Sequence, residues 1–317
     1  MKKFSLIFIP VIFIITSCSH SSKNSKIITI LHAGSLSAPF KAIADSFETE
    51  NPEITVNLEA SGSLANARKI IDLNRNCDIF ASADYLITNE LLMPDYTDFN
   101  IVFAGNEMAI AYTQKSKYNE IINDKNWYEI LLKNDVIYGR SDPNSDPCGY
   151  RTEILIALAE KMQNSSRQIG TKFELLNKNK NSIRPKEVDL IALLQTNSID
   201  YAFLYLSVCK QHNLNYLKLP DSINLSNHKL KEHYRKGETT INFNNPNEKK
   251  IITGEAILYS ITVLKEAYNK PEVIKFFKFF FDEYKGQKIL KMQDHAPLDE
   301  VIIYGADKIP GKIKPIF

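Results

Sequence analysis

Three short segments combine serine or aspartate with glycine at points where an apolar run gives way to a helical pattern. They are Ala33–Ser37 (AGSLS), Ser61–Ser63 (SGS) and Ser141–Gly149 (SDPNSDPCG). A helix start presents unpaired N–H groups and a partial positive charge, serine hydroxyls add donors, and glycine lets the backbone approach closely. If these turns lie together, they could bind an oxyanion without any Lys or Arg.

A simpler interpretation is that Ser35, Ser63 and Asp146 only cap the helices that follow them, as these residue types often do. For each residue alone, capping is the better explanation. Three such turns after successive apolar runs favour a shared binding site instead.

The elements that would position these turns follow a regular order. Apolar runs of strand length alternate with segments of helical periodicity from residue 26 onward. The pattern predicts strands at 27–31, 54–58, 78–81, 107–112, 137–140, 201–205 and 256–264. It predicts helices at 37–50, 64–73, 85–93, 127–132, 149–162, 187–196 and 271–281, and a surface insert at 163–182. This alternation is typical of an α/β fold with mostly parallel sheets, whose ligands bind at the carboxyl ends of the strands.

Composition excludes several classes of function. The 39 Lys and Arg residues nearly balance the 37 Asp and Glu residues, whereas a nucleic-acid-binding protein normally carries a basic surplus. With only 11 glycines in 317 residues, the chain contains no glycine-rich phosphate loop of the dinucleotide or P-loop type. The common metalloprotease and serine hydrolase signatures, HExxH and GxSxG, are also absent from the sequence.

The first residues predict export. Lys2 and Lys3 precede an apolar run at 4–15, which is too short for a membrane span of about 20 residues. The following Ile-Thr-Ser-Cys, ending at Cys18, resembles a bacterial lipobox and implies cleavage before Cys18 and its acylation. An ordinary secretory leader is the alternative. The polar stretch 19–25 would serve as a tether, and because no later segment is long and apolar enough, only the lipid would hold the protein to a membrane.

Three cysteines remain after Cys18: Cys77, Cys148 and Cys209. They permit at most one disulfide, and whether any forms stays open. Cys148 could be the nucleophile of a hydrolase, but His212 is the only mid-chain histidine near it in sequence and nothing places the two together.

Several longer stretches carry a family resemblance. They are HAGSLSAPF (32–40), ARKIIDL (67–73), ASADY (81–85), GRSDPNSDPCGYR (139–151), IRPKEVDLIALL (183–194) and QHNLNYLKLP (211–220). Across residues 26–317 the chain resembles the archaeal-type tungstate/molybdate-binding proteins, the extracellular receptors of an ABC importer for these oxyanions. The resemblance implies a monomeric, non-enzymatic receptor without a cofactor, which delivers its ligand to the permease of the importer.

The implied fold is the type II periplasmic-binding-protein fold, with two α/β lobes that close on the anion about a hinge. The expected organisation is a signal peptide at 1–17, a lipidated tether at 18–25, one lobe formed by 26–110 with 266–317, and a second lobe at 111–265.

The ligand positions that the resemblance implies come from both lobes. They are Gly34, Ser35, Ser63, Asp146, Pro147, Cys148, Glu187 and Tyr205. Among them, Asp146 and Glu187 would each give one carboxylate oxygen to the metal atom and raise it from four to six oxygen ligands. Without the resemblance, Asp146 would be a turn residue before Pro147, and Glu187 a favourable acid in the first turn of a helix.

The two carboxylates distinguish a tungstate or molybdate receptor from the alternative functions. Like charges about 4 Å apart repel by about 4 kcal/mol at an effective dielectric constant near 20. Direct bonding to a hard, highly charged metal compensates this repulsion, whereas the sulfur of sulfate and the phosphorus of phosphate cannot readily expand their coordination. The alternatives are a sulfate or phosphate receptor that uses hydrogen bonds alone, a hydrolase based on Cys148 or a serine, and a purely structural surface lipoprotein. The preference between tungstate and molybdate stays open.

Overall fold

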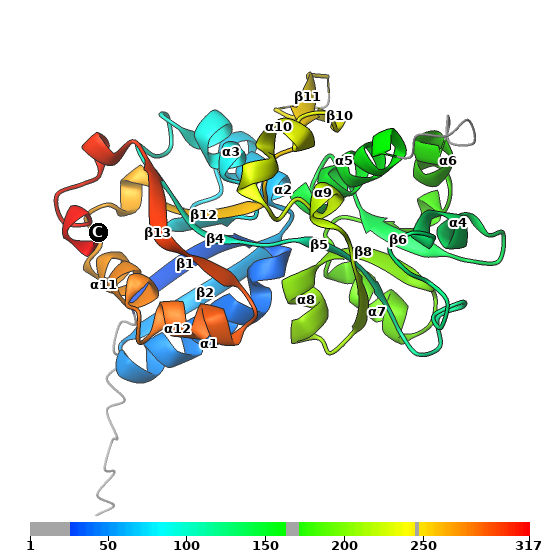
Figure 1. Ribbon diagram of the computed structural model, residues 1–317. Coiled ribbons are helices and arrows are strands. Elements are labelled where there is room, and N and C mark those ends of the chain that lie inside the picture. The colour runs from blue at the N-terminus through cyan, green and yellow to red at the C-terminus, as the bar shows by residue number, and fades with distance from the viewer. Residues whose placement is uncertain (1–25, 163–170, 245–246) are drawn as a thin grey trace, which may run out of the picture.

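Two sheets, each covered by helices, form two lobes that lie side by side (Figure 1). The computed structural model describes residues 26–162, 171–244 and 247–317. The predicted leader, the lipidation site Cys18 and the tether therefore lie outside the described residues. The predicted α/β class with two mostly parallel sheets is confirmed.

The first sheet has six strands in the order β13-β4-β12-β3-β1-β2. Their bounds are β1 (Lys26–Ala33), β2 (Ile54–Ser61), β3 (Ile79–Ser82), β4 (Asn100–Gly105), β12 (Leu258–Val263) and β13 (Ala296–Tyr304). β1 pairs in parallel with β2 and β3, while β12 runs antiparallel between β3 and β4. The carboxyl ends of β1, β2 and β3 consequently meet at one edge of the sheet.

Apolar helix faces cover this sheet. The helices are α1 (Ser37–Glu50), α2 (Ser63–Asp72), α3 (Tyr85–Ile87), α11 (Pro271–Phe281) and α12 (Gly286–Met292). α1 buries Phe40, Ile43, Ala44 and Phe47, the face that its periodicity predicts. The Phe47 ring lies 5.2 Å from Phe276 and 5.5 Å from Phe279, so the phenylalanine cluster of α11 is core. Burying each such ring stabilises the lobe by roughly 1.5–3 kcal/mol.

The second sheet has five strands in the order β7-β6-β8-β5-β9. They are β5 (Met108–Tyr112), β6 (Tyr138–Ser141), β7 (Ile183–Arg184), β8 (Tyr201–Tyr205) and β9 (Asn215–Lys218). The helices of this lobe are α4 (Trp127–Leu132), α5 (Pro147–Met162), α6 (Thr171–Asn177), α7 (Asp189–Gln195), α8 (Leu206–Gln211), α9 (Asp221–Asn224) and α10 (Lys231–Tyr234). A separate hairpin pairs β10 (Glu238–Asn242) with β11 (Lys249–Thr253).

The chain crosses between the lobes at two places that differ from those predicted. It passes from β4 to β5 through residues 106–107, and it returns from β11 to β12 through 254–257. The predicted boundary at 110/111 falls inside β5, which pairs with β8 and β9. The predicted boundary at 265/266 is also wrong. It assigns β12 to the second lobe, but β12 pairs with β3 and β4 in the sheet of the first lobe. An apolar run predicts a strand but does not say which sheet an antiparallel strand joins.

Other local differences are smaller. The predicted helix at 85–93 is the short α3 followed by a π-helical turn at Thr88–Leu92. The described part of the predicted surface insert contains α6, whose Leu175 is buried. Within the described residues, no helix has both the length and the apolar character that crossing a bilayer requires.

Candidate anion-binding site

The three turns predicted from the sequence lie at the contact between the lobes. β1 and β2 are paired so that Ala33 lies beside Ser61, which places the first two turns at the same sheet edge. The third turn faces them from the second lobe, and the Ala65 N–H donates to the Ser145 carbonyl oxygen at 3.1 Å. A Cβ atom added at Gly62 would lie only 2.2 Å from that same oxygen. The glycine therefore permits the backbones of the two lobes to touch.

Two carboxylates are buried at this contact. Asp146 is 1% exposed and Glu187 is completely buried. The Asp146 carboxylate accepts a hydrogen bond from the Glu187 N–H at 2.9 Å and a longer one from the Cys148 N–H at 3.4 Å. Glu187 reaches the turn of the other lobe, because a Cβ at Gly34 would lie 3.3 Å from its Oε2. In the part of the chain that the structure describes, neither carboxylate oxygen of Glu187 has a hydrogen-bond partner.

No cation of the described residues compensates the charges of this pair. Among the described residues, no Lys or Arg forms an ion pair with Asp146 or Glu187. Burial, followed by the negative charge of Asp146, raises the pKa of Glu187 well above its ordinary value. Burial likewise raises the pKa of Asp146. A buried charge without a partner is strongly unfavourable, so this pair of carboxylates lowers the stability of the folded protein.

Three hydroxyl groups of the predicted site each accept a hydrogen bond from the protein. The Ser35 Oγ accepts from the Tyr259 hydroxyl at 2.8 Å, and the Ser63 Oγ accepts from the Ala83 N–H at 3.0 Å. The Tyr205 hydroxyl oxygen accepts from Arg151 Nη1 at 2.8 Å. A hydroxyl that accepts in this way keeps its own proton for donation. Ser35, Ser63 and Tyr205 can thus all donate to an anion.

Helix capping explains part of this arrangement. Asp146 precedes α5 and its side chain accepts from the N–H of Cys148, as a cap does. Ser35 and Ser63 do not cap: α1 and α2 begin after Leu36 and Gly62, and neither has a side-chain cap. The two serines are therefore not explained by helix stability.

The structure brings Gly34 against Glu187, and Gly62 against Asp146, where the lobes meet; Ser63 follows Gly62 and is buried. Pro147 is the first residue of α5 and has no N–H, so it can shape the site but cannot donate. The thiol of Cys148 is buried and points to the Phe203 carbonyl oxygen at 3.7 Å. Burial, with the nearby Glu187 and Asp146 charges, raises its pKa well above the ordinary value, which makes it a poor nucleophile. Cys77, Cys148 and Cys209 are all buried free thiols.

Several residues of this region were missed by the sequence analysis. Ser141 has a buried hydroxyl without a partner among the described residues. Burial raises the pKa of Asp146, and the nearby Ser141 hydroxyl opposes part of this rise. Tyr259 on β12 links the hinge to the site, because Asn106 Nδ2 donates to its hydroxyl at 3.1 Å and that hydroxyl donates to Ser35. No local motif marks Tyr259, whose hydrogen-bond partners Asn106 and Ser35 both lie more than a hundred residues away in the chain. Ser141 was within the third turn and could have been included.

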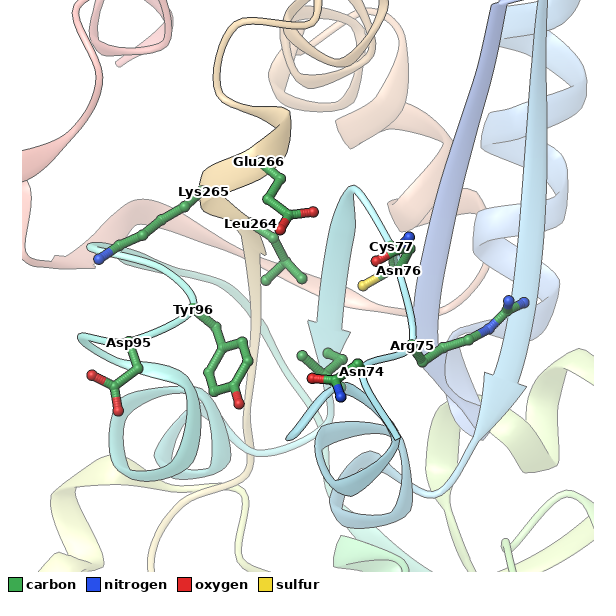
Figure 2. A pocket seen from close by; sticks show the side chains of 10 residues that line it. Asn74, Arg75, Asn76, Cys77, Asp95, Tyr96, Leu264, Lys265 and Glu266 are labelled. Atoms are coloured by element: carbon green, nitrogen blue, oxygen red, sulfur yellow. The ribbon is translucent and has the colours of Figure 1, made fainter. Parts of the chain in front are cut away.

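A surface pocket of about 270 Å³ lies elsewhere on the first lobe (Figure 2). Asn74 and Cys77 line one side, and Tyr96 and Lys265 line the other. Cys77 precedes β3, so this pocket is at the amino end of that strand, whereas the candidate site is at the carboxyl end. The pocket is therefore separate from the candidate site.

Two lobes joined by two crossing segments, with buried polar groups where they meet, define a solute-binding protein that encloses its ligand. Residues 28–293 match the family described as bacterial extracellular solute-binding protein, and the chain belongs to this family. It is thus a solute-binding component of an ABC transporter.

Named relatives span nearly the whole chain. A solute-binding protein of Petrotoga mobilis, whose function is uncharacterized, is 40% identical over 289 residues, which cover 90% of this chain and 88% of that one. The molybdate/tungstate-binding protein WtpA of Pyrococcus abyssi is 39% identical over 336 residues, with 96% and 95% covered. The periplasmic molybdate-binding protein of Azotobacter vinelandii superposes with a TM-score of 0.58 at 14% identity, over 86% of this chain and 100% of the other. This last likeness confirms the predicted periplasmic-binding-protein fold.

Replacing Glu187 by Gln is expected to stabilise the protein in the absence of any anion. An acid whose pKa is raised on folding contributes stability below its ordinary pKa of 4.5 and loses it as the pH rises toward the folded value. At pH 8, Glu187→Gln should raise the melting temperature by at least about 2 °C. Differential scanning calorimetry between pH 5 and pH 8 measures this effect.

The matched control is Glu153→Gln. Glu153 is also buried but forms an ion pair with Arg140 at 3.0 Å, so its neutralisation should lower the melting temperature. A fall for Glu187→Gln of the same size as for Glu153→Gln would mean that Glu187 has a cationic partner after all.

Gly62→Ala is expected to prevent full closure of the lobes. The backbone at Gly62 (φ −61°, ψ 140°) suits alanine, but the added Cβ would meet the Ser145 carbonyl oxygen at 2.2 Å. The clash should lower anion affinity about ten- to hundredfold with little change in the fold of either lobe. Isothermal titration measures the affinity, and Gly311→Ala, where a Cβ would contact nothing, is the control. An affinity within about threefold of the wild type would show that the lobes do not close to this distance.

Proposed function

We propose that this protein is a lipid-anchored receptor that captures tungstate or molybdate between its lobes and delivers it to the permease of an ABC importer. The observation that carries the proposal is the fully buried carboxylate of Glu187, without a hydrogen-bond partner in the described chain and beside the buried Asp146. The names of the Pyrococcus and Azotobacter relatives support the same ligand class.

The residues present fit an oxyanion with a large, highly charged central atom. Ser35, Ser63 and Tyr205 would donate hydrogen bonds to the oxo groups, together with backbone N–H groups of the Gly34 turn. Asp146 and Glu187 would each supply one oxygen to the metal and complete six-coordination, which converts their mutual repulsion into attraction. Among the described residues, no group of three or more His, Cys, Asp and Glu side chains could hold a metal ion. Most ligands of the metal would accordingly be its own oxo groups.

A tetrahedral anion such as sulfate or phosphate is disfavoured by the same carboxylates. It would bring two or more negative charges beside Asp146 and Glu187, and its central atom does not accept two further oxygens. The hydroxyl donors alone would have to overcome a repulsion of several kcal/mol in a site shielded from water. Selectivity would thus come from repulsion of the wrong anion as much as from attraction of the right one.

Capture and release would follow from movement about the two crossing segments, 106–107 and 254–257. Asn106, in the first segment, donates hydrogen bonds to Ser207 at 2.8 Å in one lobe and to Tyr259 at 3.1 Å in the other. The lipid on Cys18 and the tether would keep the monomeric receptor close to its permease.

Titration of the purified protein with tungstate, molybdate, sulfate and phosphate tests the proposed ligand. We expect tungstate and molybdate to bind at least about a thousandfold more tightly than the other two, a difference of roughly 4 kcal/mol. Equal or tighter binding of sulfate or phosphate would support the receptor that uses hydrogen bonds alone. Heat from none of the four anions would contradict the proposal.

Substitutions at the site test whether Asp146 and Glu187 bond to the metal or only lie beside the anion. Asp146→Asn and Glu187→Gln should each lower tungstate affinity about ten- to hundredfold, because each replaces an anionic ligand of the metal by a neutral amide. Cys148→Ala should change affinity by less than about threefold, since its thiol is directed at Phe203. Undiminished affinity in both carboxylate variants, measured by titration calorimetry, would exclude coordination by these residues.

The lipid anchor has its own test. Cys18→Ser should move the protein from the membrane fraction to the soluble fraction and abolish incorporation of labelled fatty acid, because acyl chains provide the stable attachment. Continued membrane association of the variant would indicate an attachment other than the lipid.

A further inference from the structure

Arg151 is a cation of the second lobe that is buried against the first. It lies on α5 and is 4% exposed. Its Nη1 donates to the Ala83 carbonyl oxygen at 2.6 Å and to the Tyr205 hydroxyl at 2.8 Å, while its Nη2 lies 3.2 Å from Asp84 Oδ2. Ala83 and Asp84 follow β3 of the first lobe, whereas Tyr205 ends β8 of the second. One guanidinium thus joins both lobes to a residue of the candidate site.

Asp84 is held from both sides of the contact. It is 6% exposed, and its Oδ1 accepts from the Leu86 N–H at 3.0 Å as the cap of α3. Its Oδ2 accepts from the Tyr150 hydroxyl at 2.6 Å as well as pairing with Arg151. Consecutive residues of α5, Tyr150 and Arg151, therefore converge on one carboxylate of the other lobe.

We propose that the interlobe bridge, defined as Arg151, Asp84 and Tyr150, holds the lobes closed over the ligand and positions Tyr205 for donation to it. Separation of the lobes would break the ion pair and its hydrogen bonds together. Removing one partner of a buried, hydrogen-bonded charge pair mainly raises the dissociation rate and leaves the association rate little changed. The bridge therefore governs how long the ligand stays bound.

The bridge also fixes the direction of the Tyr205 hydroxyl. Arginine can only donate, so the Tyr205 oxygen accepts from it and the tyrosine proton is left to point at the ligand. The planar guanidinium donates to three acceptors at once. The ammonium group of lysine would present its donors in a different geometry. Arg151 is thus a positioning residue, and it does not itself need to touch the anion.

Asp84→Asn is the sharpest test, because asparagine keeps the size and the capping oxygen but removes the charge. We expect it to raise the tungstate dissociation rate about tenfold in stopped-flow measurements, with the association rate changed less than about twofold. Fluorescence energy transfer between labels on the two lobes measures the fraction of molecules whose lobes are closed (the closed fraction). This fraction should be smaller in Asp84→Asn than in the wild type, with and without anion. Arg151→Lys should retain more of the closed fraction than Arg151→Gln.

Glu153→Gln is the matched control. It breaks another buried pair of α5, the one with Arg140, which lies wholly within the second lobe. This variant should lower the melting temperature yet leave the dissociation rate and the closed fraction within about twofold of the wild type.

The proposal would be overturned if Asp84→Asn had the same dissociation rate and the same closed fraction as Glu153→Gln. The bridge would then have a purely structural role. The dissociation rate rests on the proposed function, whereas the closed fraction does not. If the wild type binds none of the four anions, the proposed function fails, and the closed fraction without ligand still decides whether the bridge holds the lobes together.

Discussion

Two carboxylates that lie buried together, with no cation paired to them in the described part of the chain, are the constraint on which the rest of this structure depends. Asp146 and Glu187 lie where the lobes meet, and burial raises the pKa of both. Such a pair opposes folding, so its presence is a cost that a ligand must offset. A ligand with a strongly electrophilic central atom could bind the carboxylate oxygens, and its own oxygens could accept hydrogen bonds from the nearby hydroxyls. Such a ligand would compensate the buried negative charges.

The fold supplies the geometry that the proposed ligand would require. Parallel pairing of β1 with β2 brings two serine turns to one sheet edge, and the glycine at 62 lets the second lobe approach them. Within each lobe, other groups donate to the hydroxyls of Ser35, Ser63 and Tyr205, so their protons remain free for the ligand. The Tyr259 contacts connect this arrangement to the hinge, and under the proposed function they would couple ligand binding to lobe closure.

Much of the fold and the turns of the candidate site could be predicted from local sequence patterns. Strand-end turns with serine and glycine, and the apolar faces of α1 and α11, follow from short-range patterns that the sequence displays directly. The strands β4 and β13 and the sheet to which β12 belongs depend on pairing between distant segments, which periodicity does not encode. For the same reason the bridge between Arg151 and Asp84 could not be foreseen, although Arg151 closes the GRSDPNSDPCGYR motif. The positions of the carboxylates came from family resemblance, since a buried unpaired glutamate has no signature in a single sequence.

The central claim is that carboxylate oxygens bond directly to the bound metal atom. X-ray absorption at the tungsten edge on the protein with one equivalent of tungstate measures the number of oxygen neighbours without crystals. The account predicts six, four of them oxo groups and two at longer distance from Asp146 and Glu187. A spectrum of four equivalent oxygens, unchanged from free tungstate, would contradict it.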